Sequence, residues 1–522
     1  MQRRHFLAAS ALPLIGCDAQ HESAPDIEGG FEGVNLERGH RLRDTEAWPA
    51  PSVTHRTRVL IAGGGVAGLA AARALRLRGM NDFALLELEN SAGGNARATQ
   101  LQGIDCPMGA HYLPVPGDDA PPLQDLLEEL GLRRRVSGRW VWDEMHLCHS
   151  PQERLFFRGE WQEGLLPLHG VAPQTLAAYR QFSALVERLS KATRWLMPVS
   201  SVRASALQLE LDGLTFFAWL KQQGLSDAQL LWYLDYSCRD DFGAGLATVS
   251  AWAGIHYFAS RHGFHVPGDS SAEREGVFTW PEGNAWLTRR LAAPLAAAGQ
   301  LHTGQIVLRI EEGKHGVQVD AFNTASQAVE RWHAQRCIVA LPVMVAARVL
   351  QNPDARVRER AAHLGYAPWL VANVHLAQPL NDRPGAAPSW DNVIYPDGSA
   401  STLHSLGYVD AKHQSLQRVP GATVLTWYLA LGDVPDARRR LFEQPWTHWR
   451  DALLADLAVP HPDLRSKLTR MAVTRYGHAM AMPWVFGAGR FGIVALEAEL
   501  GTAHSLSSSG HTMSMPGMTM NV

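Results

Sequence analysis

A run of glycines directly after an apolar segment constrains this chain more than any other feature. Residues 59–62 are apolar, residues 63–68 read G-G-G-V-A-G and fit the pattern G-x-G-x-x-G, and residues 67–77 have the small and apolar residues of a helix that packs on a sheet. A strand, a glycine turn and a helix are the context in which this pattern predicts a Rossmann βαβ unit. We therefore expect an α/β protein with a dinucleotide site at this turn.

Each position of the motif has a separate physical task. Gly63 permits the tight turn, Gly65 lets the backbone approach a diphosphate, and Gly68 allows the helix to touch the strand. Ala67 lies in the first turn of the helix, whose N-terminus attracts phosphate charge. Glu87 ends the next apolar run, where its carboxylate can bind both hydroxyls of a ribose. These residues fit either FAD or a nicotinamide dinucleotide.

The stretch after the second apolar run separates these two cofactors. Residues 85–97, L-L-E-L-E-N-S-A-G-G-N-A-R, resemble the second-strand extension of flavin-containing amine oxidoreductases, the family of monoamine and polyamine oxidases and their desaturase relatives. The resemblance implies FAD as the cofactor. It places Gly93, Gly94 and Arg97 at the FAD diphosphate and Leu88 beside Glu87 in the cofactor site.

Four further stretches resemble the same family. Residues 280–284, 306–310 and 337–342 are similar to the central segment of its FAD domain, in which the backbone of Val307 takes the position that contacts adenine. Residues 109–112 are similar to the element that passes the flavin ring. The resemblance therefore implies that four more residues contact the cofactor, namely Gly109, Ala110, His111 and Tyr112.

The C-terminal part departs from the family pattern. Members usually end with a strand, a small-Gly-acidic motif for the ribityl chain, and a helix. Residues 493–501, I-V-A-L-E-A-E-L-G, loosely resemble this motif, with Glu499 as the candidate for the ribityl contact. The residues beyond it are too polar and too rich in glycine to predict the helix.

The apolar pattern and the resemblance together predict a discontinuous FAD-binding Rossmann-type domain with an inserted, partly helical α+β substrate domain. Helices are expected over most of residues 122–220 and at 246–260, and strands at 305–310, 317–322, 337–341, 370–376 and 424–431. The expected order is a signal at 1–17, a tether at 18–57, the FAD-binding domain at 58–115, 273–345 and 476–505, the substrate domain at 116–272 and 346–475, and a disordered Met/His/Ser-rich tail at 506–522.

Candidate catalytic residues follow from the resemblance and from side-chain chemistry. Arg348 occupies the place where amine oxidases commonly have a lysine that binds flavin N5 through water. Because arginine stays protonated, it can orient water or a substrate carboxylate but hardly acts as a base. His256, Tyr476 and His478 are the other candidates, since aromatic faces near a flavin can hold and desolvate an amine. Core packing is the alternative role for these rings.

Two adjacent carboxylates add a substrate candidate. Asp240 and Asp241 can pair a cationic substrate, or they belong to a solvated turn. No protein base is required for amine oxidation, because the flavin itself can accept a hydride from the carbon next to a neutral nitrogen.

The first residues predict export. Residues 2–7, Q-R-R-H-F-L, place paired arginines before an apolar run much shorter than the ~20 residues that span a bilayer, which is typical of a twin-arginine signal. Residues 14–17, L-I-G-C, resemble a lipobox, and Asp18 follows. We therefore expect a periplasmic protein with a lipid anchor at Cys17 in the inner membrane, or else an ordinary cleavage site. The other four cysteines are too few for a disulfide scaffold.

The net charge and the composition of the C-terminal tail indicate which partners the chain could bind. The net charge of -3 leaves no basic excess, so nucleic acid is not an expected partner. Residues 511–520 contain four methionines and one histidine, soft ligands that suit Cu(I), although a disordered tract without a ligand has the same composition. No other metal site is predicted.

The sequence therefore predicts an FAD-dependent oxidoreductase that oxidises a small amine or polyamine by hydride transfer to the flavin. One alternative is an FAD-dependent desaturase or isomerase of an apolar substrate, which the aromatic content and the missing lysine favour. Another is a non-catalytic, exported, copper-binding lipoprotein with a degenerate FAD fold, which the altered C-terminus favours. Nothing in the sequence indicates the electron acceptor.

Overall fold

The computed structural model describes residues 27–43, 48–197, 199, 203–261, 263–266, 276–396, 405–415, 421–486, 489–490, 504–507 and 513–514. The candidate signal, Cys17, Glu499 and nearly all of the methionine-rich tail lie outside these residues. Within them, no helix combines the length and the apolar character needed to cross a bilayer.

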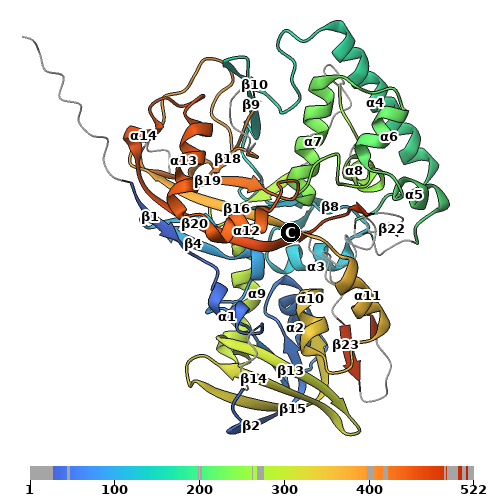
Figure 1. Cartoon of the computed structure of the whole chain (residues 1–522), viewed down its shortest axis with the longest axis vertical. Helices are drawn as coiled ribbons and strands as arrows, with labels where there is room; N and C mark the ends of the chain where they lie inside the picture. Colours follow the sequence, from blue (N-terminus) through green and yellow to red (C-terminus); the bar gives the residue numbers. More distant parts are fainter. Residues whose placement is uncertain are drawn as a thin grey trace, which may run out of the picture.

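A mixed sheet in the lower half of Figure 1 carries the glycine turn. Its order is β12-β3-β2-β15-β14-β13, and the four strands from β12 to β15 are parallel. The strands are β2 (Val53–Ala62), β3 (Phe83–Leu86), β12 (Leu301–His302), β13 (Gln305–Gly313), β14 (Gly316–Asn323) and β15 (Ala328–Val339). Their parallel order is the arrangement expected of a Rossmann-type domain, so the α/β prediction is confirmed.

Helices cover both faces of this sheet because successive residues of β2 point to opposite sides. Val59 and Ile61 pack in one core with α2 (Val66–Leu77) and α9 (Ala285–Ala297). Leu60 and Ala62 pack in another core with α10 (Val343–Val349), which α11 (Ala355–His363) follows. A strand buried on both faces reads as a continuous apolar run, as residues 59–62 do.

A second sheet has eight strands in the order β1-β20-β16-β19-β18-β17-β9-β10. The strands are β1 (Glu28–Phe31), β9 (Glu153–Phe157), β10 (Glu160–Glu163), β16 (Tyr366–Leu376), β17 (Asp391–Ile394), β18 (Tyr408–Asp410), β19 (Thr423–Ala430) and β20 (Leu468–Ala481). Its central strands β16 and β19 are almost wholly buried, because helices pack on both faces.

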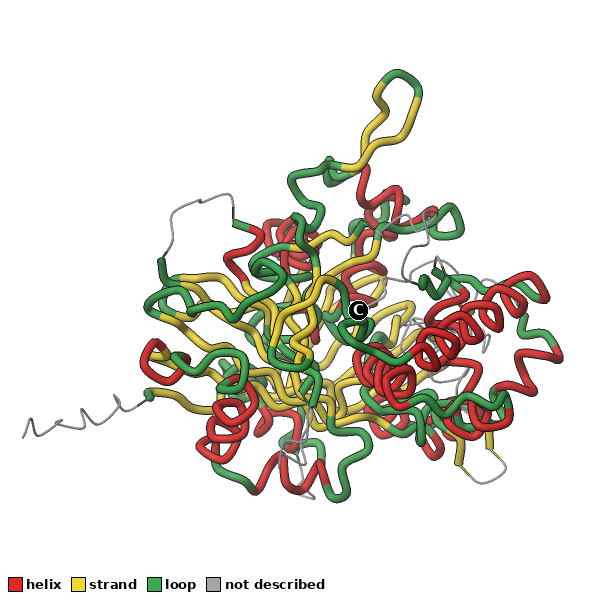
Figure 2. Tube along the Cα trace, turned by 90° about the horizontal axis from the view of Figure 1, so that it is seen from above, coloured by secondary structure: helices red, strands yellow, loops and turns green. Residues whose placement is uncertain are grey.

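Two groups of helices cover the second sheet. One core joins it to α12 (Ala437–Glu443), α13 (Trp446–Leu457) and α14 (Leu464–Lys467). The largest core joins it to a helical layer, seen beside the strands in Figure 2, made of α4 (Pro173–Ala192), α5 (Ala206–Leu211), α6 (Phe216–Gln222), α7 (Ala228–Phe242) and α8 (Ala251–Ala259).

The remaining elements are short. They are α1 (Leu36–His40), η1 (Gly94–Ala96), β4 (Ala98–Leu101), β5 (Ile104–Pro107), β6 (Tyr112–Pro114), α3 (Pro121–Glu129), β7 (Arg133–Val136), β8 (Arg139–Trp142), β11 (Val277–Thr279), η3 (Ala411–Gln414), β21 (Val485–Phe486), β22 (Gly489–Arg490), β23 (His504–Ser507) and β24 (Met513–Ser514). Residues 476–481 extend β20 of the second sheet, whereas β23 pairs with residues 336–339 of β15 in the first.

The structure corrects two predictions. Residues 133–163, expected to be mostly helical, form two hairpins whose turns have positive φ at Ser137 and Gly138 and at Arg158 and Gly159. Two consecutive positive φ values are characteristic of tight hairpin turns, a signal that outweighs the helical pattern. The tether expected at residues 18–57 is wrong for its described part, which contains β1, α1 and the start of β2.

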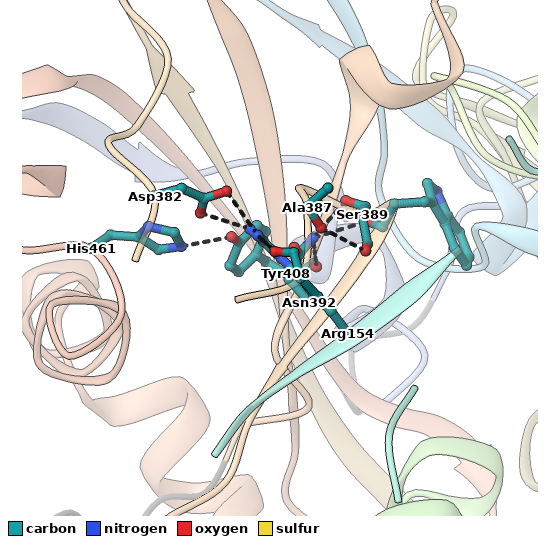
Figure 3. A network of polar contacts seen from close by, with 9 residues as sticks. Arg154, Asp382, Ala387, Ser389, Asn392, Tyr408 and His461 are labelled. Carbon is teal, nitrogen blue, oxygen red and sulfur yellow. Dashed lines mark hydrogen bonds and ion pairs between the residues drawn. The ribbon is translucent and has the colours of Figure 1, made fainter. Parts of the chain in front are cut away.

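A buried arginine network holds the far edge of the second sheet (Figure 3). The Arg154 guanidinium donates to both oxygens of Asp382, at 2.9 and 3.1 Å, and its Nε donates to Asn392 at 2.6 Å. Its Cζ lies 3.9 Å from the centroid of the Trp161 ring. The Tyr408 hydroxyl and Nε2 of His461 share a hydrogen bond of 2.7 Å beside it. Arg154 thereby joins β9 to β17 and to the loop after β16.

Replacing Arg154 by alanine is expected to lower the free energy of unfolding by about 3 kcal/mol, because it leaves Asp382 and Asn392 without their cation. The urea midpoint of unfolding measures the loss. Arg158→Ala is the control, since Arg158 is exposed at the tip of the same hairpin and should cost less than about 1 kcal/mol. Equal midpoints for the two variants would contradict a structural role for Arg154.

Candidate active site

One cavity of about 560 Å³ joins the two sheets, which is a size typical of small-molecule sites. At one end it is lined by the turn between β2 and α2, the end of β3 and the end of β15. At the other end it is lined by β16, β19 and β20 and by the C-terminal part of α7. Residues far apart in the sequence therefore face the same space.

Most of the predicted cofactor residues line this cavity. They are Gly63, Gly65, Ala67, Glu87, Leu88, Gly93, Gly94, Gly109, Ala110, His111, Tyr112 and Val307. Gly68 and Arg97 are not in its wall. Arg97 is buried behind it, where its Nε donates to the carbonyl of Gly94 at 3.2 Å and its Nη2 lies 3.4 Å from Glu89. Arg97 therefore holds the glycine loop from behind.

The three motif glycines differ in what surrounds them. A Cβ on Gly68 would meet the carbonyl oxygen of Gly63 at 1.9 Å, and Gly63 itself has φ +104. Both glycines are therefore required by the fold of the turn. A Cβ on Gly65 would meet only the Cα of Gly94, at 3.8 Å, and would otherwise project into the cavity. Gly65 thus keeps the cavity open, as the approach of a diphosphate requires.

Glu87 is fixed by backbone donors at the end of β3. Its Oε2 accepts a hydrogen bond from the amide of Gly64 and its Oε1 accepts one from the amide of Glu89, both at 2.8 Å. Burial raises the pKa of Glu87, and the two amide hydrogen bonds oppose the rise. The carboxylate is held beside the glycine turn with lone pairs left for ribose hydroxyls.

This end of the cavity fits the adenosine and diphosphate of a dinucleotide. The first turn of α2 presents backbone amides, the facing loop supplies Gly94 without a side chain, and Val307 adds an apolar wall. Amides and a helix N-terminus stabilise phosphate charge, and the carboxylate of Glu87 accepts hydrogen bonds from ribose.

Aromatic rings line the other end. The Tyr428 hydroxyl donates to the carbonyl of Gly109 at 3.0 Å, and the Tyr476 hydroxyl donates to that of Met108 at 2.8 Å. The His111 ring stacks on Tyr428 with centroids 4.5 Å apart. Burial lowers the pKa of His111 to about 4, so this ring is neutral near pH 7. Trp369 of β16 is in the same wall. The two hydroxyls are occupied by the backbone, and the rings form a rigid apolar chamber.

Charged groups of the helical layer reach the same chamber. Asp240, Asp241 and Arg261 all line the cavity, and the Arg261 Nη2 lies 3.0 Å from Asp241. Asp240 makes no hydrogen bond or ion pair with any residue that the structure describes. Burial, and then the charge of Asp241, raise the pKa of Asp240 to about 7. A carboxylate without a partner in an apolar chamber is suited to bind a cation.

The catalytic candidates from the sequence divide into two groups. Tyr476 and His478 line the cavity, and burial, followed by the nearby Arg438, lowers the pKa of His478 to about 4. His256 is instead buried in the helical layer, where Nε2 lies 3.0 Å from the Leu196 carbonyl. Its ring also lies 5.0 Å from that of Trp252, and it lines a separate cavity of about 20 Å³. The catalytic prediction for His256 is therefore wrong, because its ring belongs to the core.

Arg348 also lies away from the chamber. It is exposed on α10 and is not in the cavity wall, to which Val345 and Ala346 of the same helix contribute. Its place in the sequence matched the family's lysine, but the helix turns it to the solvent side. Sequence reasoning missed several wall residues, for which no local motif exists, namely Gly39, Leu42, Arg356, Arg360 and Trp369.

The comparisons with known proteins decide the family. The sequence profile described as "Flavin containing amine oxidoreductase" matches residues 66–447. The chain belongs to this family. It is thus an FAD-dependent, amine oxidase-like oxidoreductase, and the FAD prediction is confirmed.

The relatives of this flavin enzyme are distant. It is 23% identical over 451 residues to "Probable polyamine oxidase 4" of Arabidopsis thaliana, covering 85% of this chain and 78% of the relative. A redesigned putrescine oxidase has a TM-score of 0.61 at 17% identity, covering 85% of this chain and 90% of the other. Cyclohexylamine oxidase from Brevibacterium oxydans has a TM-score of 0.59 at 17% identity, with the same coverage. At these identities the structural likeness shows the fold and not the substrate.

Among the residues that the structure describes, no group of three or more His, Cys, Asp or Glu is placed to hold a metal ion. The four described cysteines, Cys106, Cys148, Cys238 and Cys337, are free thiols. The copper prediction concerns the tail, nearly all of which is outside the described residues.

Proposed function

We propose that this enzyme oxidises a small amine that carries a second cationic nitrogen, a diamine or polyamine, by hydride transfer to the flavin. The observation that carries the proposal is Asp240, which has no hydrogen-bond or ion-pair partner among the described residues and lies in the wall of an aromatic chamber continuous with the FAD end of the cavity. Putrescine oxidase and a probable polyamine oxidase among the relatives agree with a substrate of this class.

The chamber has two effects on such a substrate. Its rings exclude water and favour the neutral form of the reacting nitrogen, because desolvation disfavours a charged amine. Asp240 attracts the distal ammonium and sets how deep the amine lies, and the faces of Tyr428 and Trp369 are surfaces on which a cation is also stabilised. The substrate is therefore oriented by its far end and desolvated at its near end.

The flavin supplies the redox step, since it accepts a hydride from the carbon next to the neutral nitrogen. The amine loses that hydride and one N–H proton and becomes an imine, which water hydrolyses to an aldehyde and ammonia or a shorter amine. No side chain of this chain is assigned as the base. His111 and His478, whose pKa values are lowered to about 4, are neutral near pH 7 and do not repel the cation.

The two alternatives are less well supported. Desaturation or isomerisation of an apolar substrate would leave the Asp240 carboxylate against hydrocarbon, which is costly without a partner. A non-catalytic copper-binding lipoprotein does not explain why the FAD end and an acidic aromatic chamber form one cavity. Export and lipidation at Cys17 remain predictions.

Anaerobic mixing of the purified enzyme with putrescine, n-butylamine and an unsaturated fatty acid tests the function. We expect putrescine to bleach the flavin band at about 450 nm fastest, the monoamine more slowly, and the fatty acid not at all. Product analysis by mass spectrometry then identifies the aldehyde. Turnover of the fatty acid without any bleaching by amines would overturn the proposal in favour of isomerisation.

A further inference from the structure

Residues 27–43, here called the N-terminal arm, precede the region that matches the family, which begins at residue 66. The arm connects the two halves of the protein. Its strand β1 pairs in parallel with β20, with Glu28 opposite Arg470 and Phe31 opposite Val473. The chain then leaves the second sheet, and α1 leads toward the first sheet (Figure 1), where the arm contacts the loop after β3.

Past β1, the arm binds the loop that follows β3. The amide of Asn35 donates to Glu89 Oε1 at 2.9 Å. The Arg38 Nη1 donates to the carbonyl of Leu88 at 3.0 Å and to the side chain of Asn90 at 2.8 Å. Three consecutive residues of the loop therefore bind the arm.

This loop is the one that positions the cofactor residues. The amide of Glu89 donates to the carboxylate of Glu87, and the Glu89 carboxylate faces Arg97, which holds the carbonyl of Gly94. The contact of Asn35 with Glu89 is thus one residue removed from the ribose carboxylate of Glu87, and two residues, Glu89 and Arg97, separate it from the glycine loop at the diphosphate. The arm fixes both by holding the loop between them.

The arm also forms part of the cavity wall itself. Gly39 and Leu42 line the cavity. Leu42 and Leu88 both pack against one buried apolar cluster, and Leu42 and Val345 pack against another that contains Val307. Val307 is the adenine candidate, so Leu42 lies over the adenosine end.

The arm is fastened by contacts that do not involve the cofactor loop. The Arg41 Cζ lies 4.8 Å from the Trp48 ring centroid and 4.3 Å from that of Phe322. The Arg470 Nη2 lies 3.1 Å from Glu32. These contacts place the arm without touching the cavity, and they offer controls on the same segment.

We propose that the N-terminal arm is a wall of the FAD site, which closes over the adenosine half of the cofactor and slows its release. The relevant ligand chemistry is an adenosine diphosphate moiety, held by Glu87 and the glycine turn on one side and by Leu42 on the other. Arg38 is a positioning residue, because it acts through the loop, whereas Leu42 faces the cofactor.

The rate at which FAD leaves the full-length holoenzyme tests the proposal, measured as the rise of flavin fluorescence after dilution. We expect Arg38→Ala and Leu42→Ala each to release FAD roughly tenfold faster than the wild type, the change expected for about 1.4 kcal/mol. Arg41→Ala is the matched control from the same helix end and should release FAD within about twofold of the wild-type rate. The urea midpoint of each apoprotein is recorded alongside.

Three results would overturn the proposal. Wild-type release rates in both Arg38→Ala and Leu42→Ala would show that the arm does not retain the cofactor. The same acceleration in Arg41→Ala, in step with a loss of apoprotein stability, would show a general structural role. Flavin that stays with the wild-type protein after denaturation would show a covalent bond, which leaves the arm nothing to retain. None of these results depends on the substrate class.

Discussion

Replacing Gly65 by valine is expected to yield a folded protein that purifies without FAD. The substituted Cβ would meet no protein atom closer than the Cα of Gly94, at 3.8 Å, so the Cβ itself causes no clash with the turn. The valine methyl groups would instead occupy the space beside the α2 N-terminus, where the diphosphate must approach. Loss of the amide contacts to phosphate should weaken FAD binding by roughly a thousandfold, or about 4 kcal/mol.

Visible absorbance and circular dichroism together check this prediction. The flavin band should be missing at a protein concentration that gives a full band for the wild type, while the far-ultraviolet spectrum stays unchanged. Gly68→Ala is the informative comparison, because its Cβ would lie 1.9 Å from the carbonyl oxygen of Gly63 and should lower thermal stability as well as flavin content. A Gly65→Val protein with a full complement of FAD would contradict the placement of the diphosphate.

Replacing Asp240 by asparagine should lower kcat/KM for a diamine by about a hundredfold, because the distal ammonium loses a buried charge partner, and the nearby Asp241 is already paired with Arg261. The same variant should change kcat/KM for n-butylamine less than about threefold, since that amine has no second cation. Steady-state kinetics on the two amines measures both values. The monoamine is the control for damage to the flavin or to the chamber.

The role proposed for Asp240 also predicts the direction in which kcat/KM for diamines changes with pH. With its pKa raised to about 7, the Asp240 carboxyl is neutral below that pH and anionic above it. Because kcat/KM reports groups of the free enzyme, kcat/KM for diamines should rise as the pH increases through about 7. A further rise toward pH 10, where amines lose their proton, should be common to both substrates. Asp240→Asn should remove only the first rise. A diamine profile without that rise in the wild type would contradict the role of Asp240.

Local patterns in the sequence were sufficient for the cofactor half of the protein. The turn at residues 63–68 depends on the φ freedom of Gly63 and on contacts between the turn and α2, all within a few residues of one another. The position of Glu87 could also be predicted, because the strand before it pairs with β2 and therefore ends beside the glycine turn. The FAD fingerprint, the parallel pairing of β2 with β3 and the most specific part of the family resemblance could therefore be predicted from residues 59–97.

Only the tertiary structure decided which side chains share the substrate chamber. Asp240 comes from α7, Trp369 from β16 and Tyr428 from β19, and no spacing in the sequence relates them. Tertiary packing also explains why two of the predicted catalytic residues lie outside the chamber. Arg348 and His256 carry suitable chemistry, yet the rotation of α10 exposes the first and the packing of α8 buries the second. Which face a helix turns to a cavity depends on its packing partners as well as on its own residues.

The N-terminal arm illustrates the same limit. Residues 27–43 are polar and without a sustained period, so the sequence by itself determined only that they precede the first long strand. Their structure comes from partners far along the chain, since β1 pairs with β20 and Arg38 binds the loop after β3. Short-range backbone preferences determined the glycine turn and its strands, whereas hydrogen bonds and apolar contacts between distant segments determined the chamber and its cover.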